Sequence, residues 1–183
     1  FTRYSRLGAS SRLRSLQYLP ALRNMGFEIS VFPFFDDDYV LGIYSRRRGL
    51  INSVKYYAAR IAQSRKAVDS DIVWIEKETL PWVPWFLERS ILPRRTPYVV
   101  DYDDAIFHRY DQATAGIKRA LLHDKIDMVM KNSACVMVGN SYLGQRASKA
   151  GALRIEWVPT VIDIDRYSVV SSRRKATCTR VGW

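Results

Sequence analysis

The stretch YVVDYDDAIFH, residues 98–108, begins as a buried strand and ends in polar side chains. Its first three residues are the aromatic and β-branched types that strands favour. Asp101, Asp103, Asp104 and His108 follow them. Because a carboxylate is costly to bury without a partner, we expect this strand to leave the core at its carboxyl end, beside a polar site.

Segments with the period of a strand alternate along the chain with segments that have the period of a helix. This order predicts one α/β domain: a doubly wound, mainly parallel, Rossmann-like sheet with helices on both faces. After a strand end at residue 1, the predicted strands span residues 27–34, 71–75, 98–102, 134–138 and 154–158. The predicted helices span residues 13–25, 50–66, 81–95, 116–131 and 141–150.

The composition is that of a globular protein with a strongly basic surface. The chain has 183 residues, of which 48% are hydrophobic, and a formal net charge of +11. Such a charge attracts nucleic acid, anionic lipid headgroups or sugar phosphates, and it does not by itself distinguish them. The sequence has no apolar run of about 18 residues and no signal-peptide pattern. We therefore expect a cytoplasmic protein, either free or peripheral on the cytoplasmic membrane face.

Polar and small residues recur where the predicted strands end. In sheets of this kind ligands bind outside the carboxyl ends of the strands, so we expect these residues to meet at one edge. Carboxylates can orient hydroxyls or act as bases, and histidine titrates near neutral pH. The candidate catalytic residues are Asp103, Asp104 and His108. The candidate substrate-binding residues are Gly8, Ser10, Ser11, Arg12, Lys77, Glu78, Asn140 and Ser141.

Each of these motifs also has a plain structural interpretation. The loop before residue 13 is either a phosphate or sugar site or an ordinary serine-capped turn, and the GxGxxG and GxxxxGK[ST] patterns are absent from it. Lys77 and Glu78 either orient hydroxyls or form a solvated ion pair. Asp103 and Asp104 either line a site or cap the next helix, and two adjacent carboxylates without a third ligand do not predict a metal.

Two further segments indicate a lipid or protein partner. The predicted helix over residues 50–66, which arginines at 46–48 precede, is basic and amphipathic. Its apolar face consists of Leu50, Val54, Tyr57, Ala58 and Ile61. Residues 81–90, PWVPWFLERS, place tryptophans beside an arginine, which suits a membrane interface. Packing of the same tryptophans in the core is the alternative.

The chain resembles the N-terminal domain of retaining glycosyltransferases of family 4 in four stretches taken in order: LGASSRLRSLQYLPAL, DIVWIEKETLP, VVDYDDAIF and VGNSYLGQRASKAGALRIEWVPTVIDIDRY. The resemblance implies an enzyme of GT-B architecture, in which two Rossmann-like domains face a cleft. The N-terminal domain holds the acceptor, and the C-terminal domain binds the nucleotide-sugar donor. Residues 1–167 would be the first domain, with a truncated first strand. Residues 168–183 would be a linker and the first strand of a missing donor domain, so we expect the chain alone to be inactive.

The resemblance also implies roles for individual residues. Gly8 to Ser11 match the loop that approaches the donor phosphates and the acceptor, with Arg12 assisting. Asp103 stands where many relatives have histidine, so Asp103 or Asp104 would orient the sugar or acceptor, and His108 would re-enter the cleft. Asn140 and Ser141 match a cleft-facing turn. No metal or cofactor is implied besides the nucleotide-diphosphate sugar, which is the donor substrate.

The predicted function is therefore retaining transfer of a hexose-type sugar to a glycan or lipid-linked acceptor, with an anionic membrane surface as a further partner. A non-enzymatic basic domain that binds nucleic acid or anionic membrane is the alternative. No nucleic-acid recognition motif is visible, and the polar residues gather at strand ends rather than along one stripe. A stand-alone acceptor-binding protein is a second alternative.

Overall fold

The computed structural model describes residues 1–44, 53–112 and 117–164. Its strands are β1 (Thr2–Tyr4), β2 (Pro33–Phe35), β3 (Val73–Glu76), β4 (Tyr98–Tyr102), β5 (Cys135–Val138) and β6 (Ile155–Trp157). The α-helices are α1 (Ala9–Arg14), α2 (Leu19–Asn24), α3 (Asp37–Tyr44), α4 (Ser53–Lys66), α5 (Trp85–Ile91), α6 (His108–Asp111), α7 (Ile117–Leu122), α8 (Lys125–Lys131) and α9 (Ser141–Ala150). Two short 3₁₀ helices span Leu16–Tyr18 and Ala67–Asp69.

All paired strands run parallel. One sheet has the order β3-β4-β5-β6, and β1 pairs with β2 in a second sheet. Two hydrogen bonds place β1 beside β3: the Glu76 amide donates to the Phe1 carbonyl at 2.9 Å, and the Phe1 amino group donates to the Trp74 carbonyl at 2.6 Å. The strands therefore follow one another as β2-β1-β3-β4-β5-β6, and the strand order reverses between β1 and β3.

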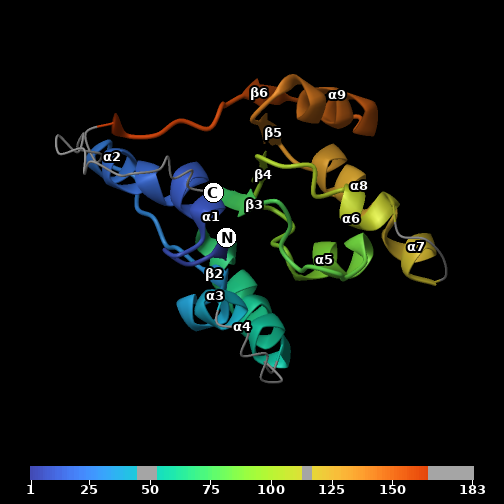
Figure 1. The fold of residues 1–183 in the computed structure, drawn as a ribbon, viewed down its shortest axis with the longest axis horizontal. Coiled ribbons are helices and arrows are strands. Elements are labelled where there is room, and N and C mark those ends of the chain that lie inside the picture. Colours follow the sequence, from blue (N-terminus) through green and yellow to red (C-terminus); the bar gives the residue numbers. More distant parts are fainter. Residues whose placement is uncertain (45–52, 113–116, 165–183) are drawn as a thin grey trace, which may run out of the picture.

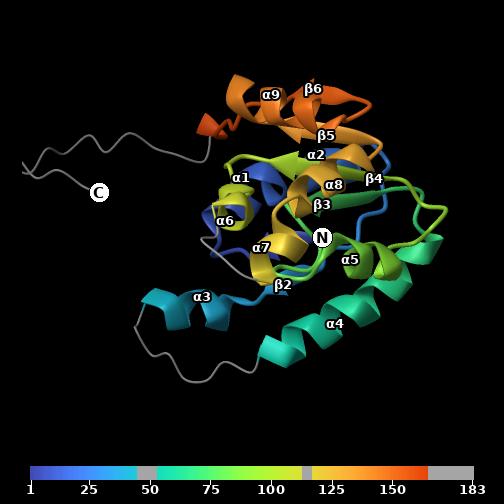
Figure 2. The same ribbon diagram turned by 90° about the vertical axis from the view of Figure 1, so that its right-hand side faces the viewer.

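Helices cover both faces of the strands, as the sequence predicts. Helices α1 and α2 lie on one face, while α5 and α8 lie on the other, and α3 and α4 extend beyond β2 (Figure 1). The view turned by 90° places α1 and α6 at the same end of the strands (Figure 2), and Figure 1 shows them on opposite sides. The predicted doubly wound, mainly parallel α/β fold is confirmed.

The main core lies between the four-stranded sheet and the helices α8 and α9. Ile75, Val100 and Val136 from three adjacent strands are fully buried, and Val129 and Met130 of α8 pack against them. A smaller cluster of Phe34, Tyr56 and Leu80 joins β2, α4 and the loop after β3. The central strand β4 is buried on both faces except at the half-buried Val99, which explains why aromatic and β-branched residues occupy four of its five positions.

Several element boundaries differ from the sequence prediction. The strand expected over residues 27–34 is reduced to Pro33–Phe35, because Phe27 and its neighbours stay exposed and only the last residues reach β1. The single helix expected over residues 13–25 instead breaks at Ser15 and restarts with Pro20 in the first turn of α2, a position that proline tolerates.

Residues 36–38 begin helix α3, which is not among the helices expected from the sequence. Asp36 Oδ1 accepts a hydrogen bond from the Tyr39 amide at 2.9 Å. Asp37 and Asp38 occupy the first turn of α3, where the positive end of the helix dipole stabilises carboxylates. The helix expected over 116–131 is divided into α7 and α8. Part of two predictions lies outside the described residues: the start of the basic segment at residues 46–48 with Leu50, and the strand at residues 180–183.

Helix α4 leaves three residues of its predicted apolar face exposed. Val54, Ala58 and Ile61 are exposed, and Arg60 is buried among aromatic rings instead. The Arg60 guanidinium lies 4.5 Å from the centre of the Phe1 ring and donates to the Thr2 carbonyl at 2.9 Å. Burial lowers the pKa of Arg60 to about 9. Contacts with aromatic faces and a carbonyl oxygen compensate the cost of burying the Arg60 charge. The helical period of the sequence gives no information about such contacts.

Gly8 begins α1 at a point where the backbone passes against Tyr4. A methyl group at Gly8 would lie 2.2 Å from Tyr4 Cβ. We therefore expect Gly8→Ala to lower the free energy of unfolding by about 1–3 kcal/mol, measured by urea denaturation. Gly139→Ala is the matched control, since a methyl group there comes no closer than 3.6 Å. Equal stability of the two variants would contradict the close packing of α1 on β1.

Candidate functional site

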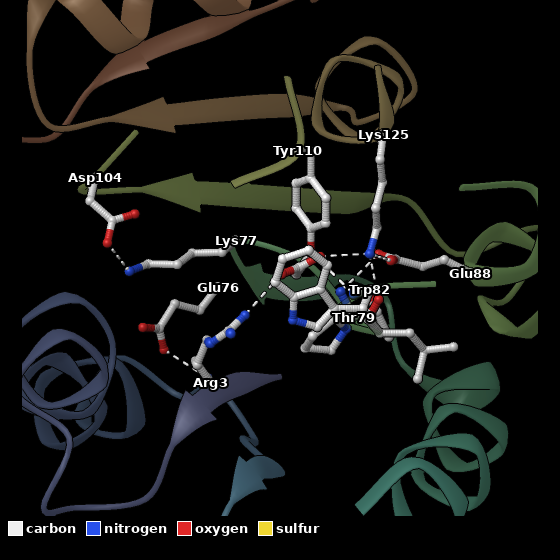
Figure 3. A network of polar contacts seen from close by, with 12 residues as sticks. Arg3, Glu76, Lys77, Thr79, Trp82, Glu88, Asp104, Tyr110 and Lys125 are labelled. Atoms are coloured by element: carbon white, nitrogen blue, oxygen red, sulfur yellow. Dashed lines mark hydrogen bonds and ion pairs between the residues drawn. The ribbon is translucent and has the colours of Figure 1, made fainter. Parts of the chain in front are cut away.

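The site is built on a three-residue turn at the carboxyl end of β3. The Glu78 amide donates to the Glu76 carbonyl at 2.8 Å, and Lys77 between them has a φ of 67°. A γ-turn with positive φ at a non-glycine residue is rare and strained. The turn separates three consecutive charged side chains, so that Lys77 points toward Asp104 and away from Lys125 and Glu88 (Figure 3).

The Glu76 carboxylate joins the turn to α1. Its Oε2 accepts hydrogen bonds from the Arg3 amide at 2.9 Å and from Ser11 Oγ at 2.5 Å. Ser10 Oγ lies 2.8 Å from Glu76 Oε1 and also 2.8 Å from Asp103 Oδ2. A hydroxyl has one proton to donate, so Ser10 serves these two carboxylates alternately and holds them close together.

The Lys77 ammonium faces the two aspartates that follow β4. Its Nζ lies 3.0 Å from Asp103 Oδ1 and 2.8 Å from Asp104 Oδ2. Burial by itself raises the pKa of Asp103, but the charge and hydrogen bond of Lys77 outweigh it and leave that pKa below 3.8. Burial likewise opposes the charge of Lys77, while Asp103 and Asp104 raise the lysine pKa above 10.5. The Asp104 side chain is 52% exposed and is the open end of this group.

Beneath these residues, Arg14 of α1 pairs with Asp101 of β4. Arg14 Nε donates to Asp101 Oδ2 at 2.9 Å, Nη2 donates to Oδ1, and both side chains are almost fully buried. Burial raises the pKa of Asp101, against the opposing effect of Arg14. Arg14 Nη1 also donates to the Val158 carbonyl and approaches Thr160 Oγ1 at 3.4 Å. Arg14 thus connects α1, β4 and the segment after β6.

Glu78 belongs to a second, fully buried network. It pairs with Arg3 at 2.9 Å and with Lys125 at 2.6 Å, and it accepts the Tyr110 hydroxyl at 2.7 Å. Lys125 also lies 3.0 Å from Glu88 (Figure 3). Burial opposes both carboxylate charges; Lys125 and Arg3 nevertheless keep the pKa of Glu78 low, whereas the pKa of Glu88 is raised.

The structure gathers only part of the predicted set. Ser10, Ser11, Lys77, Asp103 and Asp104 come together, linked directly or through Glu76. The interpretation of residues 77 and 78 as a solvated ion pair is wrong, because both side chains are buried and each has other partners.

The remaining predicted residues make contacts outside this group. Arg12 is exposed and donates to the Arg6 carbonyl at 3.2 Å. The His108 ring nitrogens lie 3.1 Å from Asp111 and 2.7 Å from the Tyr142 hydroxyl, so the ring is turned toward α9, and its catalytic role stays a prediction. Asn140 caps α9 by accepting from the Leu143 amide at 3.0 Å, and Ser141 is exposed.

Sequence reasoning missed the buried partners of this site. Glu76, Asp101, Arg14 and Lys125 were not among the predicted site residues, although their contacts hold the predicted ones in place. The one available signal was local: Glu76 ends an otherwise apolar strand, where a charged side chain needs a partner. Nothing in the spacing indicates that the partners lie about 65 residues earlier, in α1.

This arrangement offers hydroxyl-binding groups at the point where the strand order reverses, which is the usual ligand position in such sheets. No group of three or more metal-ligating residues suited to an ion occurs within the described residues. No helix in that part of the chain has both the length and the apolar composition needed to cross a membrane. No protein-family model matches the chain, and neither does any curated protein or solved structure.

Replacing Lys77 by methionine is expected to raise the pKa of Asp103. Burial would then act on the carboxylate without the opposing ammonium. A depressed pKa stabilises the folded state above the unfolded value of 3.8, and this contribution is lost as the pH falls through the lower folded value. Lys77→Met should therefore be destabilising at neutral pH and less so below the native pKa of Asp103. Carbon-detected NMR titration of the Asp103 carboxyl measures the shift, and an unchanged midpoint would disprove the coupling.

Replacing Lys125 by methionine is expected to cost about 3–5 kcal/mol of unfolding free energy, because it leaves the buried Glu88 without a counter-charge and Glu78 with Arg3 alone. The penalty should shrink at acid pH, where Glu88, whose pKa is already raised, takes up a proton. Urea denaturation at several pH values measures both effects. The control is Lys131→Met at the exposed end of the same helix, for which we expect a change within about 0.5 kcal/mol.

Proposed function

We propose that the chain is the acceptor-side domain of a retaining glycosyltransferase of GT-B architecture, as its sequence resemblance implies. The observation that carries the proposal is the group formed by Ser10, Glu76, Lys77, Asp103 and Asp104. These residues come from three separate segments and meet at the carboxyl ends of β3 and β4, beside the reversal in strand order. That is the position at which doubly wound domains bind their ligands.

The chemistry of this group suits sugar hydroxyls. A carboxylate offers two acceptor oxygens, and Asp104 presents one oxygen to Lys77 and keeps half of its side chain exposed. Lys77 fixes both aspartates, so their orientation does not have to be established when a ligand binds. The exposed carboxylate would accept hydrogen bonds from acceptor hydroxyls and orient one of them for transfer.

The donor is assigned to the opposite side of the cleft in this proposal. The charged groups that surround Ser10 are two carboxylates, which repel a diphosphate, so the nucleotide sugar would be bound mainly by a second Rossmann-like domain. The exposed Arg12, two residues after Ser10 in α1, would meet the donor phosphates from this side. Transfer of a hexose-type sugar with retention is then a property of the two domains together. The proposed acceptor is a glycan or a lipid-linked sugar.

A titration of the isotope-labelled chain with simple saccharides tests the acceptor site directly. We expect methyl hexosides to shift the amide signals of Ser10, Lys77 and Asp104. Asp104→Asn should weaken this response about tenfold, since a hydrogen bond to a charged group is worth roughly 1.5–3 kcal/mol. Asp71→Asn, at an exposed position before β3, is the control.

Two outcomes would remove the proposal. One is the absence of any saccharide response at these residues across a panel of hexosides and amino sugars. The other is a response to single-stranded DNA at the same residues that weakens with salt, which would instead support a basic nucleic-acid-binding domain.

A further inference from the structure

Helix α4 turns an apolar stripe outward. Val54, Tyr57 and Ile61 follow one another at helical spacing and so share one flank. The Tyr57 hydroxyl donates to the Pro81 carbonyl at 2.7 Å, which places this flank beside the loop between β3 and α5. Val54 and Ile61 themselves are exposed, while Arg60 takes the inward position.

Exposed large apolar side chains also lie in the loop before α5 and on α5 itself. Trp82, Phe86 and Leu87 are exposed. Leu87 lies one turn before Ile91, which packs with Tyr57 against the cluster of Phe34, Tyr56 and Leu80, so Leu87 is on the side of α5 that faces α4. The two helices are neighbours in both views, and together they lie far from α9 (Figures 1 and 2). We call the exposed set the α4–α5 apolar edge, and its members, between 37% and 71% exposed, are Val54, Ile61, Trp82, Phe86 and Leu87.

Basic side chains gather at one end of this edge. Thr96 Oγ1 donates to the Val68 carbonyl at 3.5 Å, so the segment after α5 meets the segment after α4. The exposed basic residues there outnumber the exposed acidic ones, Asp69 and Asp71; they are Arg65, Lys66, Arg94 and Arg95. The chain as a whole carries a net charge of +11.

We propose that the α4–α5 apolar edge docks on an anionic lipid bilayer. Its large side chains would enter the headgroup region, and the neighbouring arginines and lysine would face the anionic headgroups. The bilayer is favoured over a second copy of the chain because anionic headgroups supply the counter-charge that this mainly basic end attracts. The docking surface lies apart from the group around Lys77 and is independent of the proposed sugar chemistry.

Vesicle sedimentation tests the docking surface. We expect the chain to bind vesicles of mixed phosphatidylcholine and phosphatidylglycerol, to bind phosphatidylcholine alone much more weakly, and to be released in part by salt. The triple variant V54Q/I61Q/F86Q should lower the partition coefficient by at least about tenfold, since each residue contributes an apolar side chain to the bilayer. Circular dichroism establishes that the variant is folded, which its exposed positions favour.

The control variant M25Q/L153Q removes apolar side chains that are at least as exposed but lie elsewhere, and it should bind vesicles like the parent chain. Brominated lipid should quench a larger share of the tryptophan fluorescence in the W157F chain than in the W82F/W157F chain, and the difference reports on Trp82; W157F removes another exposed tryptophan. An equal loss of vesicle binding in V54Q/I61Q/F86Q and in M25Q/L153Q would overturn the proposal, as would unchanged vesicle binding of the triple variant. So would a concentration-dependent dimer that the triple variant abolishes while vesicle binding persists. Saccharide titration is measured separately, so failure of one proposal leaves the other intact.

Discussion

The structure depends on one constraint: charged side chains at the ends of buried strands must find partners of opposite charge or hydrogen-bond donors. Glu76, Glu78 and Asp101 are all buried, and each would be prohibitively costly if unpaired. Their partners come from α1, from β1 and from α8. Satisfying these carboxylates therefore fixes how the first segment, the central strands and a distant helix sit against one another.

The strained turn at Lys77 makes this arrangement possible. In a regular strand Glu76 and Glu78 would project to the same side, and Lys77 to the other. The turn lets the two glutamates reach different networks and aims the lysine at Asp103 and Asp104. A backbone strain of this kind persists only where its surroundings determine it, and here hydrogen bonds and ion pairs do so on every side. The open carboxylate of Asp104 is thus held on a rigid base.

The alternation of apolar runs predicted the parallel α/β fold and the edge at which the polar residues meet, because strand burial leaves a clear local pattern. The same pattern did not predict which charged side chains are buried where a partner distant in the sequence determines their burial. Arg60 took the inward position on α4 because the rings of Phe1 and Phe34 receive it, and no helical period contains that information. Likewise, Asp103 and Ser10 could be named as site residues, but the ion pair of Arg14 with Asp101 beneath them could not.

The ion pair of Arg14 with Asp101 also connects the site to the segment that follows β6. Arg14 holds Asp101 with one part of its guanidinium and the backbone after β6 with another. The floor of the site and residues 158–160 therefore cannot move independently. The segment after β6 is thus joined to the strand that presents Asp103 and Asp104 through Arg14, in addition to the backbone hydrogen bond from the Val158 amide to the Val138 carbonyl at the end of β5.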